Sequence, residues 1–523
     1  MPEEVRSQSH PNHYLMHKYW GRKAHNLVAS YIQHFSKKGD TILDPFMGSG
    51  GVLIESKKIG RSSIGVDINP ITELIVESTL SEVEPAQLLA AYKSIIINIP
   101  DPVKDLSHTI CPKCKQKVIL LNSVWQDDVL IRIKGVCGIH NNFTKDATRF
   151  DKQLVKKAKT LLQEYEKQPD FYYPKDKVLD FVRRNGKYTV DTLFSSRNLL
   201  QSAVILRLIN QMTDEKIQQL CLLAFTSMLP NVSSMIPADK EHVTGKSGWQ
   251  ISKFWVPSCH TEKNIFISFE SRINKIYKGK LETVGSYSGA AHEVQITSAE
   301  NLSFIASSSI DYIFTDPPYG DSIAYLGLSM FWNAWLKSNV DYESEIIYDR
   351  YRGKDEKDYS LRLNKVYSEL FRVLKPGKYM SFTFHNRKLK FWKILIDSVI
   401  NQGFVLTEVR WQPQAVDSGT QGINRSNTLK GDFVYTFKKP LKNRQPQMLL
   451  DTTGESLVYK ITKKLIQQTG FVETAALYEQ IIPAIVKERA FLNSQGKILN
   501  IDLFLATEFQ YKENEEGKHG WTT

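Results

Sequence analysis

Short apolar stretches alternate with amphipathic stretches in two separate parts of the chain. Near the N-terminus, strands expected at Thr41–Leu43 and Ser63–Asp67 alternate with helices expected over residues 26–35, 52–58 and 70–80. After residue 290 the same rhythm returns, with strands expected at residues 293–297, 310–314, 379–384, 403–409 and 432–437 and helices at residues 325–336, 359–374 and 391–401. Repeated strand–helix units predict an α/β fold, in which a twisted sheet carries helices on both faces.

The residues between and beyond these two parts follow other patterns. Two short strands are expected at residues 117–121 and 129–134, and helices are expected at residues 150–165, 199–210 and 213–228. The charged segment 341–357 is expected to be a loop that can act as a lid. We therefore predict five units: residues 1–105 and 289–440 as the two halves of one α/β core, residues 106–147 as a small insertion, residues 148–288 as a mainly helical insertion, and residues 441–523 as a helical C-terminal appendage.

The first predicted strand runs into a glycine-rich turn, Asp44-Pro45-Phe46-Met47-Gly48-Ser49-Gly50. Glycines let the backbone approach a ligand closely, and the carboxylate of Asp67 at the end of the second strand suits the two hydroxyls of a ribose. The turn lacks the G-x-G-x-x-G spacing of a dinucleotide site, and its acid suits an ammonium group better than a phosphate. S-adenosylmethionine has both the ribose and the ammonium group. The alternative is a turn whose small residues serve only for packing.

A second turn follows the strand at residues 310–314 and has the sequence Thr315-Asp316-Pro317-Pro318-Tyr319-Gly320. The two prolines make this turn stiff and remove two backbone donors. The turn can hold a carboxylate, a free carbonyl and an aromatic ring in one small volume. Asp316 and the Pro317 carbonyl would then accept the two hydrogens of an exocyclic amine, and Tyr319 would stack on the ring that carries it. Taken alone, the turn is equally explained as a proline turn with a surface tyrosine.

Two tight pairs of metal-ligating residues lie in the small insertion. Cys111-Pro112-Lys113-Cys114 and Cys137-Gly138-Ile139-His140 are separated by 22 residues that contain the two expected strands. Two such knuckles on paired strands are the plan of a zinc ribbon with three cysteines and one histidine. Four protein ligands leave no open position for a water molecule, so we predict a structural Zn²⁺ rather than a catalytic one.

Composition and charge indicate the expected compartment and the expected class of partner. The net charge is +12, and residues 101–300 hold 29 Lys and Arg against 21 Asp and Glu, a net of +8. This excess favours a polyanionic partner bound by the middle of the chain, although a solvated basic surface explains it equally well. The five cysteines argue against a disulfide framework. Neither a membrane-spanning apolar run nor a secretory signal is evident, so a cytoplasmic protein is expected.

The two turns, Asp67 and the segment His17–Lys23 together resemble the motifs of the amino-group DNA methyltransferases. The combination with a zinc ribbon resembles a group of adenine-specific DNA methylases that contain one. The resemblance covers residues 10–80 and 290–440. It implies a methyltransferase core that has a Rossmann-like sheet and depends on S-adenosylmethionine. The inserted zinc ribbon, the inserted helical region and the C-terminal helical appendage would be additions to this core.

The resemblance also implies roles for single residues. The catalytic residues would be Asp316, Pro317, Pro318 and Tyr319. The residues that line the cofactor would be Tyr19, Asp44, Pro45, Phe46, Gly48, Ser49, Gly50, Asp67, Ile68, Ser298, Ala299 and Asp316. Many relatives have Asp where Ser298 stands, so the chain departs from the family pattern there.

The implied reaction is methyl transfer from S-adenosylmethionine to the N6 amine of an adenine flipped out of double-stranded DNA. Asp at the first position of the DPPY motif resembles adenine-N6 enzymes more than cytosine-N4 enzymes. Two alternatives share the fold, methylation of cytosine N4 and methylation of an RNA base. An alternative of another class is a zinc-ribbon protein that binds nucleic acid without catalysis. Any nuclease partner, as in restriction or phage defence, is expected to be a separate subunit.

Overall fold

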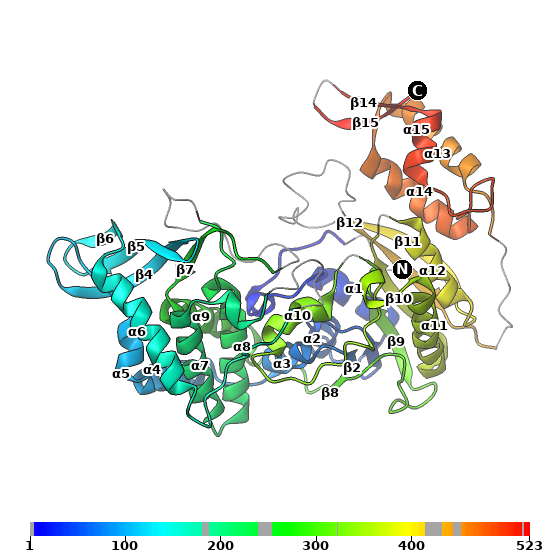
Figure 1. Ribbon diagram of the computed structural model, residues 1–523. Coiled ribbons are helices and arrows are strands. Elements are labelled where there is room, and N and C mark those ends of the chain that lie inside the picture. The colour runs from blue at the N-terminus through cyan, green and yellow to red at the C-terminus, as the bar shows by residue number, and fades with distance from the viewer. Residues whose placement is uncertain are drawn as a thin grey trace.

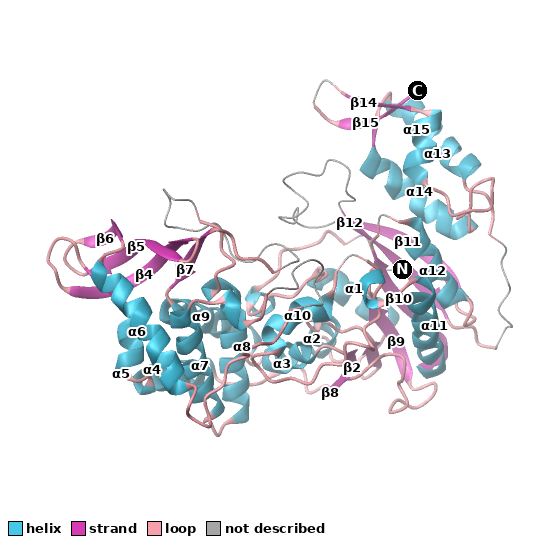
Figure 2. Cartoon of the chain, in the orientation of Figure 1, coloured by secondary structure: helices cyan, strands magenta, loops and turns pink. Residues whose placement is uncertain are grey.

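A seven-stranded sheet forms the centre of the protein in the computed structural model, which describes residues 5–179, 188–238, 254–321, 323–386, 388–413, 431–442, 451–514 and 517–523. The strand order is β11-β12-β10-β9-β1-β2-β8, and β12 runs antiparallel to both of its neighbours while the remaining pairs are parallel (Figures 1 and 2). The strands are β1 (Thr41–Asp44), β2 (Ser62–Asp67), β8 (His292–Ile296), β9 (Ile310–Thr315), β10 (Leu374–Phe384), β11 (Val405–Pro413) and β12 (Gly431–Lys438). The predicted Rossmann-like α/β sheet is confirmed.

The register of this sheet brings the two predicted turns together. Strand β1 pairs in parallel with β9 on one side and with β2 on the other, through the partners Ile42 and Tyr312 and through Leu43 and Ile64. The carboxyl ends of parallel neighbours lie at the same edge of a sheet, which is where open α/β sheets bind ligands. The glycine-rich turn after β1, the end of β2 and the DPPY turn after β9 therefore meet at one edge.

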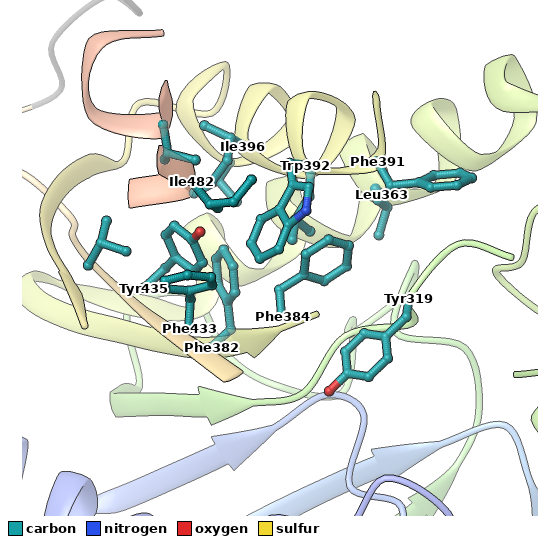
Figure 3. Packing of buried hydrophobic residues seen from close by; sticks show 14 of the residues in the cluster. Tyr319, Leu363, Phe382, Phe384, Phe391, Trp392, Ile396, Phe433, Tyr435 and Ile482 are labelled. Atoms are coloured by element: carbon teal, nitrogen blue, oxygen red, sulfur yellow. The ribbon is translucent and has the colours of Figure 1, made fainter. Parts of the chain in front are cut away.

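Helices cover both faces of the sheet because side chains alternate along its buried strands. On β9, Tyr312 and Phe314 pack on the face covered by α1 and α2, whereas Ile313 packs on the opposite face. That opposite face is covered by α11 and α12, and Figure 3 shows Trp392 of α12 among the aromatic side chains of the strands. The helices of the core are α1 (His25–Phe35), α2 (Gly51–Lys58), α3 (Pro70–Leu80), α10 (Tyr325–Asn333), α11 (Glu356–Val373) and α12 (Leu389–Ile400).

The small sheet that carries the predicted metal ligands, called the ribbon below, and the helices next to it, called the helical region, form one body beside the central seven-stranded sheet (Figure 1). The ribbon sheet has the order β3-β4-β5-β6, and β7, more than 100 residues further along the chain, pairs with residues 122–126 of β4, beyond the residues 117–119 that pair with β3. Its strands are β3 (His108–Ile110), β4 (Lys117–Gln126), β5 (Val129–Cys137), β6 (Asn141–Asp146) and β7 (Cys259–Lys263). The helices are α4 (Pro85–Asn98), α5 (Asp101–Lys104), α6 (Arg149–Tyr165), α7 (Ser196–Asn210), α8 (Glu215–Val232) and α9 (Ile265–Thr283).

The C-terminal appendage contains strands as well as the expected helices. Three short antiparallel strands in the order β13-β15-β14 accompany the helices, which is the arrangement of a winged helix. Its elements are α13 (Glu455–Thr469), β13 (Val472–Glu473), α14 (Thr474–Glu488), α15 (Ile501–Glu508), β14 (Gln510–Glu513) and β15 (His519–Thr522). The appendage packs on the sheet domain, and Figure 3 shows Ile482 of α14 beside Ile396 of α12.

The segment predicted as a lid is packed against the core. Ile346, Ile347 and Tyr348 are buried, and the Tyr348 N–H donates to the carbonyl of Gly320 at 3.1 Å. Single-turn 3₁₀ helices lie here at Arg350–Arg352 and elsewhere at Asn12–Leu15, Asp105–Ser107 and Asp191–Leu193. Among the described residues, no helix combines the length and apolar character needed to cross a membrane.

Candidate active site

A cavity opens at the edge where the two turns meet. It encloses about 1080 Å³ of empty space, a figure that includes its open mouth. Twelve of the residues predicted from sequence line it: Tyr19, Asp44, Pro45, Phe46, Gly48, Ser49, Asp67, Ile68, Ser298, Ala299, Asp316 and Pro318. Three other predicted residues, Gly50, Pro317 and Tyr319, lie next to these but are not among the described residues of its lining.

The glycine-rich turn has a conformation that only glycine adopts without strain. Gly48 has φ +50°, and a Cβ atom added there would lie 3.0 Å from the ring of Tyr19. Gly50 has φ +76°, and a Cβ atom there would lie 2.4 Å from a methyl group of Val76. The Gly48 N–H donates to the Asp67 carboxylate at 2.9 Å, which ties the turn to the end of β2.

Four carboxylates line the cavity and outnumber its two basic residues, Arg22 and Lys23. Asp44, Asp67 and Asp316 come from the strand ends, and Glu345 comes from the packed segment before α11. Burial raises the pKa of Asp44 to about 7, against hydrogen bonds from Thr315 and from the backbone that lower it. Burial likewise raises the pKa of Asp67 to about 6. Grouped carboxylates of this kind favour a cationic ligand, because a positive charge stabilises their ionised forms.

The DPPY turn is held by hydrogen bonds to two of its carbonyl groups. The Tyr359 hydroxyl donates to the carbonyl of Pro318 at 2.6 Å, and the Asn386 side-chain amide donates to that of Tyr319 at 2.7 Å. The carbonyl of Pro317 accepts no hydrogen bond from the part of the chain that the structure describes. The carbonyl that was predicted to accept an amine hydrogen is therefore without a partner among the described residues, although Pro317 itself is buried.

The Asp316 carboxylate is held in place from two sides. One of its oxygens accepts hydrogen bonds from the hydroxyls of Thr383 and Tyr319, and the other lies 3.4 Å from the Lys23 ammonium. Burial raises the pKa of Asp316 to about 6, and the charge of Lys23 limits this rise. Thr315, the residue before Asp316, donates to Asp44 at 2.8 Å and thus links the two turns.

Tyr319 lies differently from what its predicted stacking role requires. Its ring is only 8% exposed and meets the ring of Phe384 edge-on, with the ring centroids 5.5 Å apart (Figure 3). Its hydroxyl contacts Asp316 and Lys23. Stacking on a base stays a prediction, and it requires the ring to present a face that is covered in this structure.

Sequence reasoning missed several residues of the site. Lys23 was predicted only as part of the segment His17–Lys23 that resembles the family's motifs, and Thr315, Thr383, Glu345 and Asp432 had no assigned role. The two threonines carried a usable signal, because Thr315 is the last residue of β9 and Thr383 the next-to-last residue of β10, at the ligand-binding edge. Asp432 and Lys23 carried none, because they are 409 residues apart in the chain and yet form an ion pair of 3.0 Å.

The four predicted metal ligands form one cluster at the end of the ribbon. The ligand atoms of Cys111, Cys114, Cys137 and His140 all lie within 4.8 Å of one another. The Sγ atoms of Cys114 and Cys137 are 3.7 Å apart, and the His140 Nδ1 atom lies 3.6 Å from the sulfurs of both Cys111 and Cys137. A tetrahedron with metal–sulfur bonds of ~2.3 Å has edges of about 3.8 Å, so the cluster fits one tetrahedral ion.

Comparison with known proteins agrees with the geometry at the sheet edge. A family model described as a DNA methylase, of the N6/N4 methyltransferases, matches residues 2–78 and 310–519, which is more than half of the chain. The chain belongs to this N6/N4 DNA methylase family. The two matched ranges contain the glycine-rich turn and the DPPY turn, and the ribbon and the helical region lie between them.

Individual relatives are similar to this N6/N4 DNA methylase over different lengths of the chain. The type II methyltransferase M.MvaI of Kocuria varians is 22% identical over 408 residues, which cover 69% of this chain and 74% of that protein. The type II methyltransferase M.BsoBI of Geobacillus stearothermophilus is 46% identical over 72 residues, 13% of this chain and 14% of that one. The crystal structure of a SAM-dependent methyltransferase from Methanosarcina mazei covers 79% of this chain and 98% of its own, with 10% identity and a TM-score of 0.27.

Proposed function

We propose that this methylase transfers a methyl group from S-adenosylmethionine to the N6 amine of an adenine flipped out of double-stranded DNA. The observation that carries the proposal is the fixed Asp316 carboxylate in the lining of the cavity, next to a Pro317 carbonyl that accepts no hydrogen bond from the described residues. Asp at the first position of the motif favours adenine over cytosine. The acids and the ribose-compatible Asp67 fit a ligand that has an ammonium group, a sulfonium group and ribose hydroxyls.

Each residue of the site has a chemical task in this proposal. Asp67 would accept hydrogen bonds from the ribose hydroxyls, and the turn at residues 44–50 would hold the methionine part. When bound, S-adenosylmethionine supplies an electrophilic methyl group. Asp316 and the Pro317 carbonyl accept the two amine hydrogens, which draws the nitrogen towards tetrahedral geometry and frees its lone pair.

Beyond these contacts, the site would accelerate methyl transfer mainly by positioning the amine and the methyl group relative to each other. S-adenosylmethionine would supply the methyl group, with its carbon–sulfur bond breaking as the amine nitrogen bonds to the methyl carbon. Asp316, as the acceptor of an amine hydrogen, would take up the proton that the nitrogen loses and pass it to water. Because an amine inside a base pair cannot reach the turn, the base must leave the duplex.

Single-molecule sequencing of DNA from cells that express the methylase tests the proposal directly. We expect one short sequence context in which adenine carries an N6 methyl group, and no such signal from cells that express the Asp316→Ala variant. Methylation at cytosine N4 in the same assay would correct the base while keeping the reaction. A fully unmodified genome, together with tritium transfer from labelled cofactor to RNA, would overturn the proposal.

The pH dependence of turnover follows from the pKa of Asp316. Its pKa of about 6 means that the carboxylate is ionised at neutral pH and becomes protonated as the pH falls through that value. A protonated carboxyl group accepts poorly from an amine, so we expect kcat/KM to fall about tenfold per pH unit below about pH 6. The measurement is kcat/KM between pH 5 and 8.5 with cofactor and DNA both below saturation, with thermal melting at each pH as the control for unfolding. A flat profile down to pH 5 contradicts the assigned role.

We further propose that residues 106–288 bind and select the target DNA. The outward face of α6 carries a stripe of exposed lysines, Lys152, Lys156, Lys157 and Lys159. Replacing all four by alanine is expected to weaken DNA binding about tenfold or more at physiological salt and to reduce the slope of log K against log salt by up to about four. Fluorescence anisotropy with a labelled duplex measures both quantities.

A matched change at the other end of the chain serves as the control. Helix α13 carries three exposed lysines, and we expect their replacement by alanine to leave the salt slope nearly unchanged: Lys460, Lys463 and Lys464. Equal losses from both sets of lysines would show that charge alone, and not the position of α6, determines binding.

The metal cluster is proposed to hold a structural Zn²⁺. Its three sulfurs and one nitrogen match the ligand preference of zinc, and all four ligands come from the protein. The ion would fix the ends of β3, β4, β5 and β6, which have too small a core of their own for independent stability.

A further inference from the structure

Lys23 occupies a position that neither cofactor binding nor the DPPY chemistry explains. Its side chain is 13% exposed, and its ammonium group lies 3.0 Å from Asp432 and 3.4 Å from Asp316. It also donates a hydrogen bond to the Tyr319 hydroxyl and lies 5.0 Å from the centre of that ring. One lysine thus contacts two residues of the catalytic turn and a second carboxylate.

The sheet order places both carboxylate partners of this ammonium group at one edge. Strand β12 carries Asp432 at its beginning and runs antiparallel, so Asp432 lies at the same edge as the end of β9. In the order β12-β10-β9-β1-β2, Asp432 and the glycine-rich turn are on opposite sides of Asp316. Lys23 bridges Asp316 and Asp432 while it also lines the cavity shared with the glycine-rich turn, so a base amine held at Asp316 would lie within reach of its ammonium group.

Lys23 is charged in this position. Burial lowers the pKa of Lys23, but the nearby carboxylates of Asp316 and Asp432 more than offset this, and the pKa lies above its ordinary value. An ammonium group has three N–H donors and no acceptor. The contact with Asp316 is the longest of the three, so the donor directed there is the one that can turn to a new acceptor while the pair with Asp432 persists.

The Asp316 carboxylate offers a hydrogen-bond acceptor, and the Lys23 ammonium beside it offers a hydrogen-bond donor. In both adenine and cytosine, the exocyclic amine sits next to a ring nitrogen with a free lone pair, so the base edge presents a donor beside an acceptor. The two patterns are complementary. A flipped base is commonly recognised by hydrogen bonds to this Watson–Crick edge.

We propose that Lys23 recognises the Watson–Crick edge of the target base, by donating a hydrogen bond to the ring nitrogen beside the target amine while Asp316 accepts from the amine. Asp432 holds Lys23 at the right place and charge. The inference rests on the proposed methylation of a base amine and adds a base-recognition residue from the N-terminal segment, 293 positions before Asp316.

The test replaces the ring nitrogen and the lysine separately. The substrates are a duplex with the target base found by sequencing, and the same duplex with 1-deazaadenine there (3-deazacytosine where the target is cytosine). The deaza base keeps the amine and exchanges the ring nitrogen for C–H. For wild type and for Lys23→Met, the ratio of kcat/KM between natural and deaza duplex is measured. Intrinsic differences in amine reactivity cancel when the two ratios are compared.

We expect the ratio to be about 10- to 100-fold larger for wild type than for Lys23→Met, the effect of one hydrogen bond from a charged donor. Lys23→Arg should keep most of the discrimination, and Lys37→Met, a change at an exposed lysine of the same segment, should keep all of it. Where Lys23→Met does not fold by thermal melting, Lys23→Gln replaces it, since a neutral amide also removes the charged donor.

The failures of the two proposals are distinguishable. Equal ratios for wild type and a folded Lys23 variant would show that Lys23 only pairs two acids, and base methylation would stand. Absence of methyl transfer from wild type to any DNA base would instead remove the proposed function, and this inference with it.

Discussion

Replacing Asp316 by alanine is expected to lower kcat by at least about 10³-fold, the upper range for removal of one preorganised polar group. The reason is geometric, because the carboxylate is fixed by Thr383 and Tyr319 next to the carbonyl of Pro317. Alanine removes the acceptor and leaves the amine lone pair conjugated with the ring. Tritium transfer from labelled cofactor to DNA, under single-turnover conditions, measures the loss.

Cofactor affinity distinguishes this effect from a general collapse of the site. We expect the dissociation constant of S-adenosylmethionine, measured by calorimetry, to rise far less than kcat falls, because Asp44, Asp67 and Glu345 still line the cavity and the main interaction removed is the one made with the base. Lys23 retains Asp432 as a partner in the variant, so no charge is left unpaired. Asp321→Ala is the matched control, since Asp321 lies after the turn and pairs with Lys388. Full activity in Asp316→Ala rules out the assignment.

The sheet was predictable from sequence because its signals are local. Ile310–Thr315 is buried along its whole length and ends at two prolines, and Thr41–Asp44 ends at a glycine-rich turn, so each strand and its end can be recognised alone. The metal cluster was predictable for a similar reason, since each knuckle is a four-residue pattern. In both cases each strand end or knuckle is recognisable in the sequence by itself, and folding brings these units together.

Other features depend on contacts that no local pattern reveals. Strand β7 completes the ribbon from a polar stretch, Cys259–Lys263, whose partner Asn122–Gln126 lies far away in the chain. The strands of the C-terminal winged helix are two to four residues long, too short for an alternating pattern. Lys23 and Asp432 meet for the same reason, because only the final sheet order places the beginning of β12 at the same edge as the end of β9, with β10 between them.

Removing one ligand of the metal cluster is expected to cost more stability than any change at the sheet edge. Cys111→Ser should reduce bound zinc from one ion per chain to well below one, as measured by plasma mass spectrometry on dialysed protein. Structural zinc contributes about 10–16 kcal/mol of binding free energy in small domains, and this energy is folding energy. We therefore expect the ribbon to become the first region cut in limited proteolysis. Cys259→Ser, outside the cluster, should leave the zinc content unchanged.

Loss of the ion should not stay confined to the ribbon, because a buried polar network joins the ribbon to the helical region. Glu262 of β7 accepts from Trp125 of β4 at 2.8 Å and from Arg197 of α7 at 3.0 Å, and all three side chains are buried. If β4 unfolds, Glu262 and Arg197 lose partners that a buried charge requires. The melting transition of the helical region should therefore shift downwards together with that of the ribbon in Cys111→Ser. A variant without zinc that melts as wild type does would show that the cluster stabilises nothing.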